Sequence, residues 1–180
     1  MGNLPRIMRF SRNFHRFTSV LLVAIPVYYV IYWAFINVLP KTLVTINMSS
    51  TGLLKNSLPV ELQLLGFAVS LLPLSALIYG LFNIRKLFSF YREGVIFTFA
   101  HVMIFRNTAR ALIGWTVLSI LYESVKSVLF TMGNPPGQRV LSVTFGSPEM
   151  TTLVVAGIVF VIAWVMDEGR MLSEEQKLTV

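Results

Sequence analysis

Long stretches without a charged residue constrain this chain more than any other feature. Three apolar runs contain no Asp, Glu, Lys, Arg or His: residues 17–39, 62–84 and 150–166. The first two runs are each 23 residues long and the third is 17. A fourth run, residues 111–130, is interrupted only by Glu123 and Lys126. Since a helix needs roughly 20 residues to cross about 30 Å of hydrocarbon, the runs predict four membrane crossings.

Composition supports a membrane protein rather than a soluble domain. The chain is 55% hydrophobic and 13% charged, whereas a soluble domain carries about a quarter charged residues. We therefore predict an all-α fold, with a four transmembrane helix bundle in a single domain that covers residues 1–180. The predicted spans lie at about residues 17–39, 62–84, 109–129 and 149–167.

The basic residues are divided unequally between the two sides of such a protein. Eleven lie in the N-terminal segment, in or beside the loop 85–108, and in the tail 168–180. Four lie on the other side: Lys41, Lys55, Lys126 and Arg139. Lys and Arg concentrate on the cytoplasmic side of membrane proteins. The bias therefore predicts that both termini lie in the cytoplasm, and it accounts for the net charge of +7 without nucleic-acid binding.

Two segments on the opposite, outer side have the β-branched composition of strands. They are residues 43–47 and residues 139–145. A lone strand leaves its backbone hydrogen-bonding groups unpaired. We therefore expect the two segments to pair as a small extracytoplasmic two-stranded β-ribbon.

The N-terminal segment predicts an amphipathic basic helix that begins at Pro5 and continues into the first span. Its arginines recur on one face, which favours contact with anionic headgroups, so membrane lipids are expected partners. The helix is either a topology anchor or a partner-binding surface. In the second span, Pro73 predicts a kink. The helix of that span should continue to Arg92, end at Gly94 and be followed by a new helix capped by Thr98.

The pair Glu123 and Lys126 is the only ionisable pair within a predicted span. Intramembrane charges are functional candidates by default. The two residues are three apart, so they face the same way and can neutralise each other. The pair also lies near the outer end of its helix, where a lysine can reach the interface. Its role is either structural, or that of a gate, a ligand contact or a partner contact.

No pattern in the sequence points to catalysis. The chain has no Cys, which excludes disulfides and thiolate metal sites. His15 and His101 have no carboxylate or second histidine at metal-ligand spacing, so we expect both at a surface or an interface. The sequence also has no glycine-rich phosphate loop and no nucleophile elbow. We therefore expect no enzymatic activity, no catalytic or metal site, and no cofactor.

Two charged motifs resemble those of a known family. Residues 81–88 and 91–98 form the first motif, and residues 167–180 form the second. Together they are similar to the bacterial membrane-protein family called domain of unknown function 2975, which has a similar length and four spans. The resemblance implies no established activity. It also implies a partner, because many members are encoded beside a helix-turn-helix regulator of the Cro/repressor type. The chain departs from the family after Thr98, where a Pro-Glu-Asn-like helix start is usual.

The two motifs carry opposite charges and emerge on the same predicted side. We expect three basic residues of the first to dock on three acidic residues of the second: Arg85, Lys86 and Arg92 against Glu168, Glu174 and Glu175. Arg106 and Arg110 can also reach headgroups or the acidic tail. Exposed ion pairs are worth only about 0–1 kcal/mol each. The contact is therefore either a static clamp or a switch that a partner or a lipid could compete for.

These features favour a membrane-embedded regulatory or protein-interaction component whose cytoplasmic face binds a soluble regulator. Two alternatives stay open. Pro73 and the Glu123–Lys126 pair would also suit a small transporter or channel subunit. The external ribbon would suit a membrane immunity protein that blocks a toxin.

Overall fold

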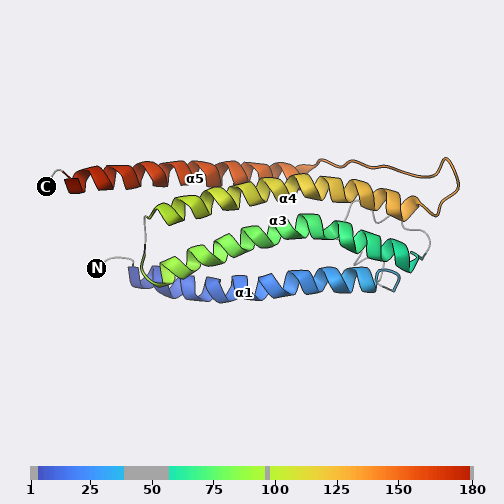
Figure 1. Cartoon of the computed structure of the whole chain (residues 1–180), viewed down its shortest axis with the longest axis horizontal. Helices are drawn as coiled ribbons and strands as arrows, with labels where there is room; N and C mark the ends of the chain where they lie inside the picture. The colour runs from blue at the N-terminus through green and yellow to red at the C-terminus, as the bar shows by residue number, and fades with distance from the viewer. Residues whose placement is uncertain (1–3, 39–56, 96–97, 179–180) are drawn as a thin grey trace.

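Each predicted span falls largely within a longer helix. The structure, a computed structural model, describes residues 4–38, 57–95 and 98–178. These residues form four helices (Figure 1): α1 (Leu4–Ala34), α3 (Val60–Arg92), α4 (Phe99–Thr131) and α5 (Ser147–Leu178). All four are long and apolar enough to cross a membrane. The prediction of a four-helix, all-α, multi-pass membrane protein is therefore confirmed.

The local signals for helix ends are also confirmed. The first helix is continuous from beside Pro5 into the first span. The second ends at Arg92, and the chain turns at Gly94, whose φ of 75° is in the left-handed region that glycine adopts without strain. Thr98 then has the extended backbone of an N-cap, with φ −109° and ψ 160°.

The four helices lie side by side in a row (Figure 1). Among the described residues, α3 contacts α1 and α4, α4 also contacts α5, and no other pair of these helix backbones comes close. The predicted four-helix bundle is therefore an open row, in which each described helix contacts only its neighbours. In lipid a helix gains nothing from hiding its apolar face, so a row costs no more than a bundle. Because the helices alternate in direction, α1 begins and α5 ends at the same end of the molecule, which we call the terminal end. The opposite end is the distal end.

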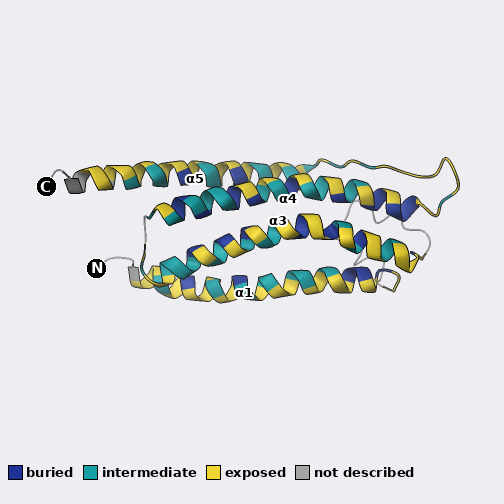
Figure 2. Ribbon diagram, in the orientation of Figure 1, coloured by how far each residue is buried: buried dark blue, intermediate teal, exposed yellow. Residues whose placement is uncertain are grey.

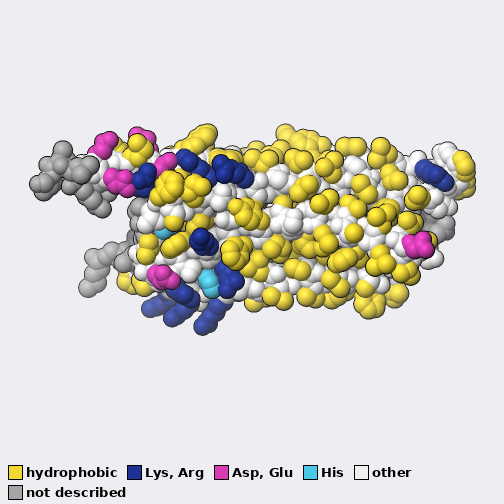
Figure 3. Space-filling view, viewed as in Figure 1, with side chains coloured by type: hydrophobic (Ala, Val, Ile, Leu, Met, Phe, Trp, Pro, Cys, Tyr) yellow, Lys and Arg dark blue, Asp and Glu magenta, His cyan; other side chains and the backbone are white. Residues whose placement is uncertain are grey.

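The surface of the row is more apolar than its helix contacts. Exposed residues follow all four helices (Figure 2), and on the face seen in Figure 3 hydrophobic side chains cover the middle while charged ones gather toward the two ends. Val23, Leu64 and Val165 are about two-thirds exposed, at 66%, 64% and 65%. The buried positions, in contrast, include several hydroxyl residues: Ser70, Thr108, Thr116, Ser127 and Thr131. Each of these hydroxyls bonds to a carbonyl three or four residues earlier in its own helix. The arrangement suits hydrocarbon outside and close helix packing inside.

A tryptophan bridges three helices at the distal end. The indole of Trp33 in α1 lies directly over Gly66 in α3. It continues to Phe130 in α4, with ring centroids 6.3 Å apart. Tyr32, Ile36 and Tyr122 complete this buried cluster. Although the backbones of α1 and α4 stay apart, side chains therefore join them across the glycine of α3. The bend of α3 in Figure 1 agrees with the kink expected at Pro73, which lies within this helix.

The expected β-ribbon is not supported. Its first half, residues 43–47, lies outside the described residues. The second half, residues 139–145, is extended but forms no strand with any described residue. Its backbone instead bonds to hydroxyls of α4: the Val140 N–H donates to Thr131 Oγ1 at 3.0 Å, and the Ser142 N–H donates to Ser127 Oγ at 2.9 Å.

The spacing of hydroxyl groups along α4 matches the spacing of amide groups along the extended segment. Two residues of extended chain advance roughly 6.5 Å, and one helical turn advances about 5.4 Å. Hydroxyls four residues apart on α4 can therefore meet amide groups two residues apart on the extended segment. The extended backbone does have hydrogen-bond partners, as expected. They are side-chain hydroxyls of a helix and not the backbone of a second strand.

We predict that Thr131→Val exposes the Val140 amide. Valine keeps the shape of threonine but leaves a donor unsatisfied, which costs about 1–3 kcal/mol. Hydrogen–deuterium exchange of residues 138–144 should become about tenfold faster or more. Thr116→Val is the matched control, because that hydroxyl bonds only to Leu112 O within α4. Equal exchange in the two variants would contradict the assignment.

We also predict that Gly66→Ala destabilises the protein in detergent. A Cβ at this position would lie 2.0 Å from Cη2 of Trp33, so the indole must move and the contact with Phe130 is lost. Overpacking of this kind costs about 1–3 kcal/mol, which a lower thermal unfolding midpoint would report. Gly114→Ala is the control, since its Cβ would meet Ala76 at an ordinary 4.0 Å. An unchanged midpoint for Gly66→Ala would show that Trp33 is free to move.

Candidate functional site

Glu123 and Lys126 form the ion pair that their spacing predicts. Lys126 Nζ donates to Glu123 Oε1 at 2.5 Å, within the last three turns of α4. The lysine side chain is completely buried, whereas the glutamate is 21% exposed. The lysine therefore does not reach outward to the interface as expected. The protein itself surrounds the ammonium group.

Aromatic residues enclose the pair. The ammonium of Lys126 lies 5.2 Å from the centroid of the Tyr122 ring, a distance suited to a cation–π interaction. Tyr32 and Trp33 approach from α1 and pack edge to face, with centroids 5.6 Å apart. Tyr32 Oη, Trp33 Nε1 and Tyr122 Oη have no hydrogen-bond partner among the described residues. A neutralised charge pair thus lies among three buried polar atoms at the distal end.

A second distal contact escaped the sequence argument. The Asn37 side chain donates to Leu58 O at 3.0 Å and accepts from the Leu58 N–H at 2.8 Å. Gln63 Nε2 also donates to Leu58 O, at 2.8 Å. One side-chain amide thereby closes both ends of a long connection, because it can donate and accept at once. Nothing in the local sequence distinguishes Asn37 from other polar residues near a helix end.

The charged terminal end is built around Asp167 of α5. Arg106 Nη2 in α4 lies 2.9 Å from Asp167 Oδ2. Asp167 Oδ1 also meets Arg170, at 3.3 Å, and Arg170 continues the chain to Glu174 at 2.8 Å. The guanidinium of Arg170 lies 5.4 Å from the Phe99 ring centroid at the start of α4. This row of charges, the Asp167 clamp, fixes α5 against α4. Arg170 and Glu174 lie four residues apart on α5, so they share one face of the helix.

The predicted docking of three basic residues of α3 on three acidic residues of α5 is not seen among the described residues. Arg85, Lys86 and Arg92 lie on α3, and α3 does not contact α5 in the described part of the chain. Direct docking on Glu168, Glu174 and Glu175 is therefore wrong, since α4 lies between the two helices. Arg92 instead lies 3.8 Å from its neighbour Glu93. The basic residue that does meet the base of the tail is Arg106, one of the two expected to reach it. Arg110 bonds to Asn107.

His101 is buried rather than at a surface or an interface. It has no exposed area, and its Nδ1 lies 2.7 Å from Thr98 Oγ1. The ring stacks on Tyr91 with centroids 5.1 Å apart. His101 therefore holds the N-terminus of α4 against the end of α3. No cluster of three His, Asp or Glu side chains in the described ranges is placed to hold a metal ion.

Breaking the intramembrane pair should destabilise the fold. We predict that Lys126→Met, which leaves Glu123 without its ammonium partner, lowers the unfolding free energy by about 3–5 kcal/mol. Adding Glu123→Gln to Lys126→Met should recover more than half of this loss, because no charge then remains. Thermal unfolding of the single and double variants in detergent tests the coupling. Additive effects of the two mutations would show that the pair does not hold the structure together.

Comparison with known proteins gives one finding. No curated protein and no solved structure is significantly similar to the chain. A family model described as protein of unknown function (DUF2975) matches residues 17–180. The match covers all four spans, the Asp167 clamp and both charged motifs. The chain therefore belongs to this family of proteins of unknown function.

Proposed function

We propose that this protein is a membrane-embedded interaction component that presents the end of α5 to a soluble regulatory protein. The proposal includes an inner-membrane location in a bacterium and both termini in the cytoplasm. The unequal distribution of basic residues supports this orientation. No catalytic role is part of the proposal.

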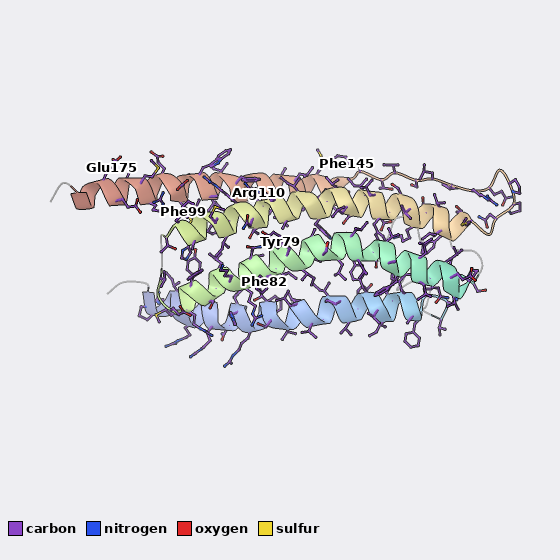
Figure 4. All side chains as sticks on the ribbon, in the orientation of Figure 1. Tyr79, Phe82, Phe99, Arg110, Phe145 and Glu175 are labelled. Carbon is purple, nitrogen blue, oxygen red and sulfur yellow. The ribbon has the colours of Figure 1, made fainter. Side chains whose placement is uncertain are left out.

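One observation carries the proposal. Beside and beyond the clamp, α5 extends past the start of α4 (Figure 1). Glu168, Met171, Leu172 and Glu175 recur there at spacings of three and four, so they share one face of the helix. Met171 and Leu172 are 48% and 54% exposed. Figure 4 shows Glu175 near the free end of the helix. We call this face the acidic stripe.

The acidic stripe has the form of a helix that binds in a groove. Such ligands anchor apolar side chains at spacings of three and four residues. Flanking charges then select the partner by electrostatic complementarity. Two acidic residues around Met171 and Leu172 favour a partner with a basic rim and an apolar groove.

A helix-turn-helix regulator fits that description. Its DNA-binding surface is basic because it must contact phosphates. The family resemblance also implies such a neighbour. Binding of the acidic stripe would compete with DNA for the basic surface, so the membrane protein would hold the regulator away from its operator. The Asp167 clamp would keep the stripe at a fixed place and angle on the membrane.

Transport is supported less well. Lys126 is buried and already paired with Glu123, which favours a structural role for the only intramembrane pair. A vesicle flux assay with Glu123→Gln separates the two functions. Flux that depends on Glu123 would favour a transporter or channel subunit over the interaction component.

The stripe predicts which mutations weaken partner capture. The tagged full chain, expressed in its own host, should retain a cytoplasmic protein when isolated from crosslinked membranes. Glu168→Gln/Glu175→Gln should reduce that retention severalfold, and Met171→Ser/Leu172→Ser should reduce it further, because apolar anchors carry most of the binding energy. The first pair of mutations leaves Arg106, Asp167, Arg170 and Glu174 intact.

Glu61→Gln is the matched control, because it removes an exposed carboxylate at the distal end. It should retain the partner fully. The captured protein should also bind DNA, and the membrane-bound chain should lower its DNA affinity. The proposal fails if the stripe variants capture as much as the control, or if the captured protein has no affinity for DNA.

A further inference from the structure

We propose that a groove between α1 and α3 at the terminal end binds the headgroup of one anionic phospholipid. The groove has a volume of about 480 Å³ and is lined by His15, Phe82, Arg85, Lys86 and Ser89. It lies on a different part of the row from the acidic stripe, and the inference does not rest on the proposed function.

The basic residues around the groove outnumber the acidic residues that could pair with them. Six basic residues of α1 and α3 form no ion pair with any described residue: Arg6, Arg9, Arg12, Arg16, Arg85 and Lys86. Figure 3 shows dark blue side chains gathered beside α1 at this end, with a histidine next to them. The nearest acidic residue along α3, Glu93, already pairs with Arg92. Such a cluster requires anions from outside the chain.

The groove lies at the level where the apolar parts of α1 and α3 end. On α3 the charge-free run ends at Ile84, directly before Arg85, and on α1 it begins at Phe17, directly after Arg16. The rings of Phe14 and Phe88 meet at 5.1 Å and set the two helices in this register. Both boundaries between apolar and charged residues therefore meet at the groove. This is the level at which hydrocarbon gives way to phosphate in a bilayer.

The side chains of α3 that line the groove follow one another in the order of the parts of a phospholipid. Phe82, Arg85, Lys86 and Ser89 have spacings of three, one and three, so they form one stripe on the helix. Phe82, 56% exposed, lies toward the membrane centre, and Figure 4 labels it on the part of α3 that faces the terminal end. The two cations follow, and the hydroxyl lies farthest out. A phospholipid has the same order: acyl chain, phosphate, polar headgroup.

These observations favour a lipid over a free anion or nucleic acid. Free phosphate has no use for Phe82, and nucleic acid would not place its charges at the edge of the hydrocarbon. Basic pockets between transmembrane helices are a known mode of headgroup binding. The chemistry selected is a phosphate diester with a small polar headgroup, such as phosphatidylglycerol.

Native mass spectrometry of the full chain in detergent tests the site. The probes are phosphatidylglycerol and phosphatidylcholine with identical acyl chains, and inorganic phosphate. Wild type should retain phosphatidylglycerol in preference to phosphatidylcholine. One charge near the surface changes affinity about fivefold, so Arg85→Gln/Lys86→Gln should weaken phosphatidylglycerol binding about thirtyfold. The exchange Arg85→Lys/Lys86→Arg keeps both charges and should bind nearly as wild type does.

Lys41→Gln/Arg139→Gln is the matched control, because it removes two charges that the sequence places on the opposite side of the membrane. Its affinity for phosphatidylglycerol should fall less than about threefold, which would show that net charge alone does not explain the loss in Arg85→Gln/Lys86→Gln. The inference is overturned if wild type binds both lipids equally, if the two Gln double variants lose the same affinity, or if inorganic phosphate displaces the lipid. The charge-preserving exchange Arg85→Lys/Lys86→Arg controls for misfolding. If this variant also loses phosphatidylglycerol binding, the assignment of the groove is rejected.

Discussion

Hydrocarbon offers no hydrogen bonds to a polypeptide backbone, so each peptide group in the membrane must be satisfied by the protein. Four long helices meet this requirement within each segment. The extended residues 139–145 lie beyond the predicted spans, and two of their backbone amides donate to hydroxyls of Ser127 and Thr131 in α4. Helix ends follow the same rule, since His101 and Thr98 close the start of α4. Most of the architecture, including the absence of strands among the described residues, follows from this one constraint.

Lipid also removes the force that closes soluble bundles. An exposed Val or Leu costs nothing beside acyl chains, so helices associate where shape and polar contacts favour it. Trp33 over Gly66 joins α1 and α3, and the Asp167 clamp joins α4 and α5. Figure 2 shows many exposed residues along α1 and α5, and these include apolar side chains such as Val23 and Val165. The row is therefore held by packing between neighbouring helices together with these specific contacts.

The row also separates two surfaces of opposite charge at the terminal end. Basic residues gather on α1 and α3, and acidic residues lie on the free end of α5, with α4 between them. If the two sets met, they would neutralise each other. Held apart, the basic groove remains available to lipid phosphates and the acidic stripe to a basic protein. The clamp residue Arg106 balances Asp167, which also meets Arg170.

The charge-free runs predict the membrane environment and the four spans. The helix ends at Gly94 and Thr98 and the pairing of Glu123 with Lys126 are also predictable, because they depend on residues close together in the chain. The row of helices, the contact of Arg106 rather than Arg85 with the tail, and the position of Tyr122 over Lys126 follow from the packing of the helices. So do the bonds of residues 139–145 to hydroxyls of a helix. These outcomes depend on which helices become neighbours. In lipid that choice rests on shape and on a few polar contacts between residues distant in the sequence, and the pattern of apolar residues carries no record of either.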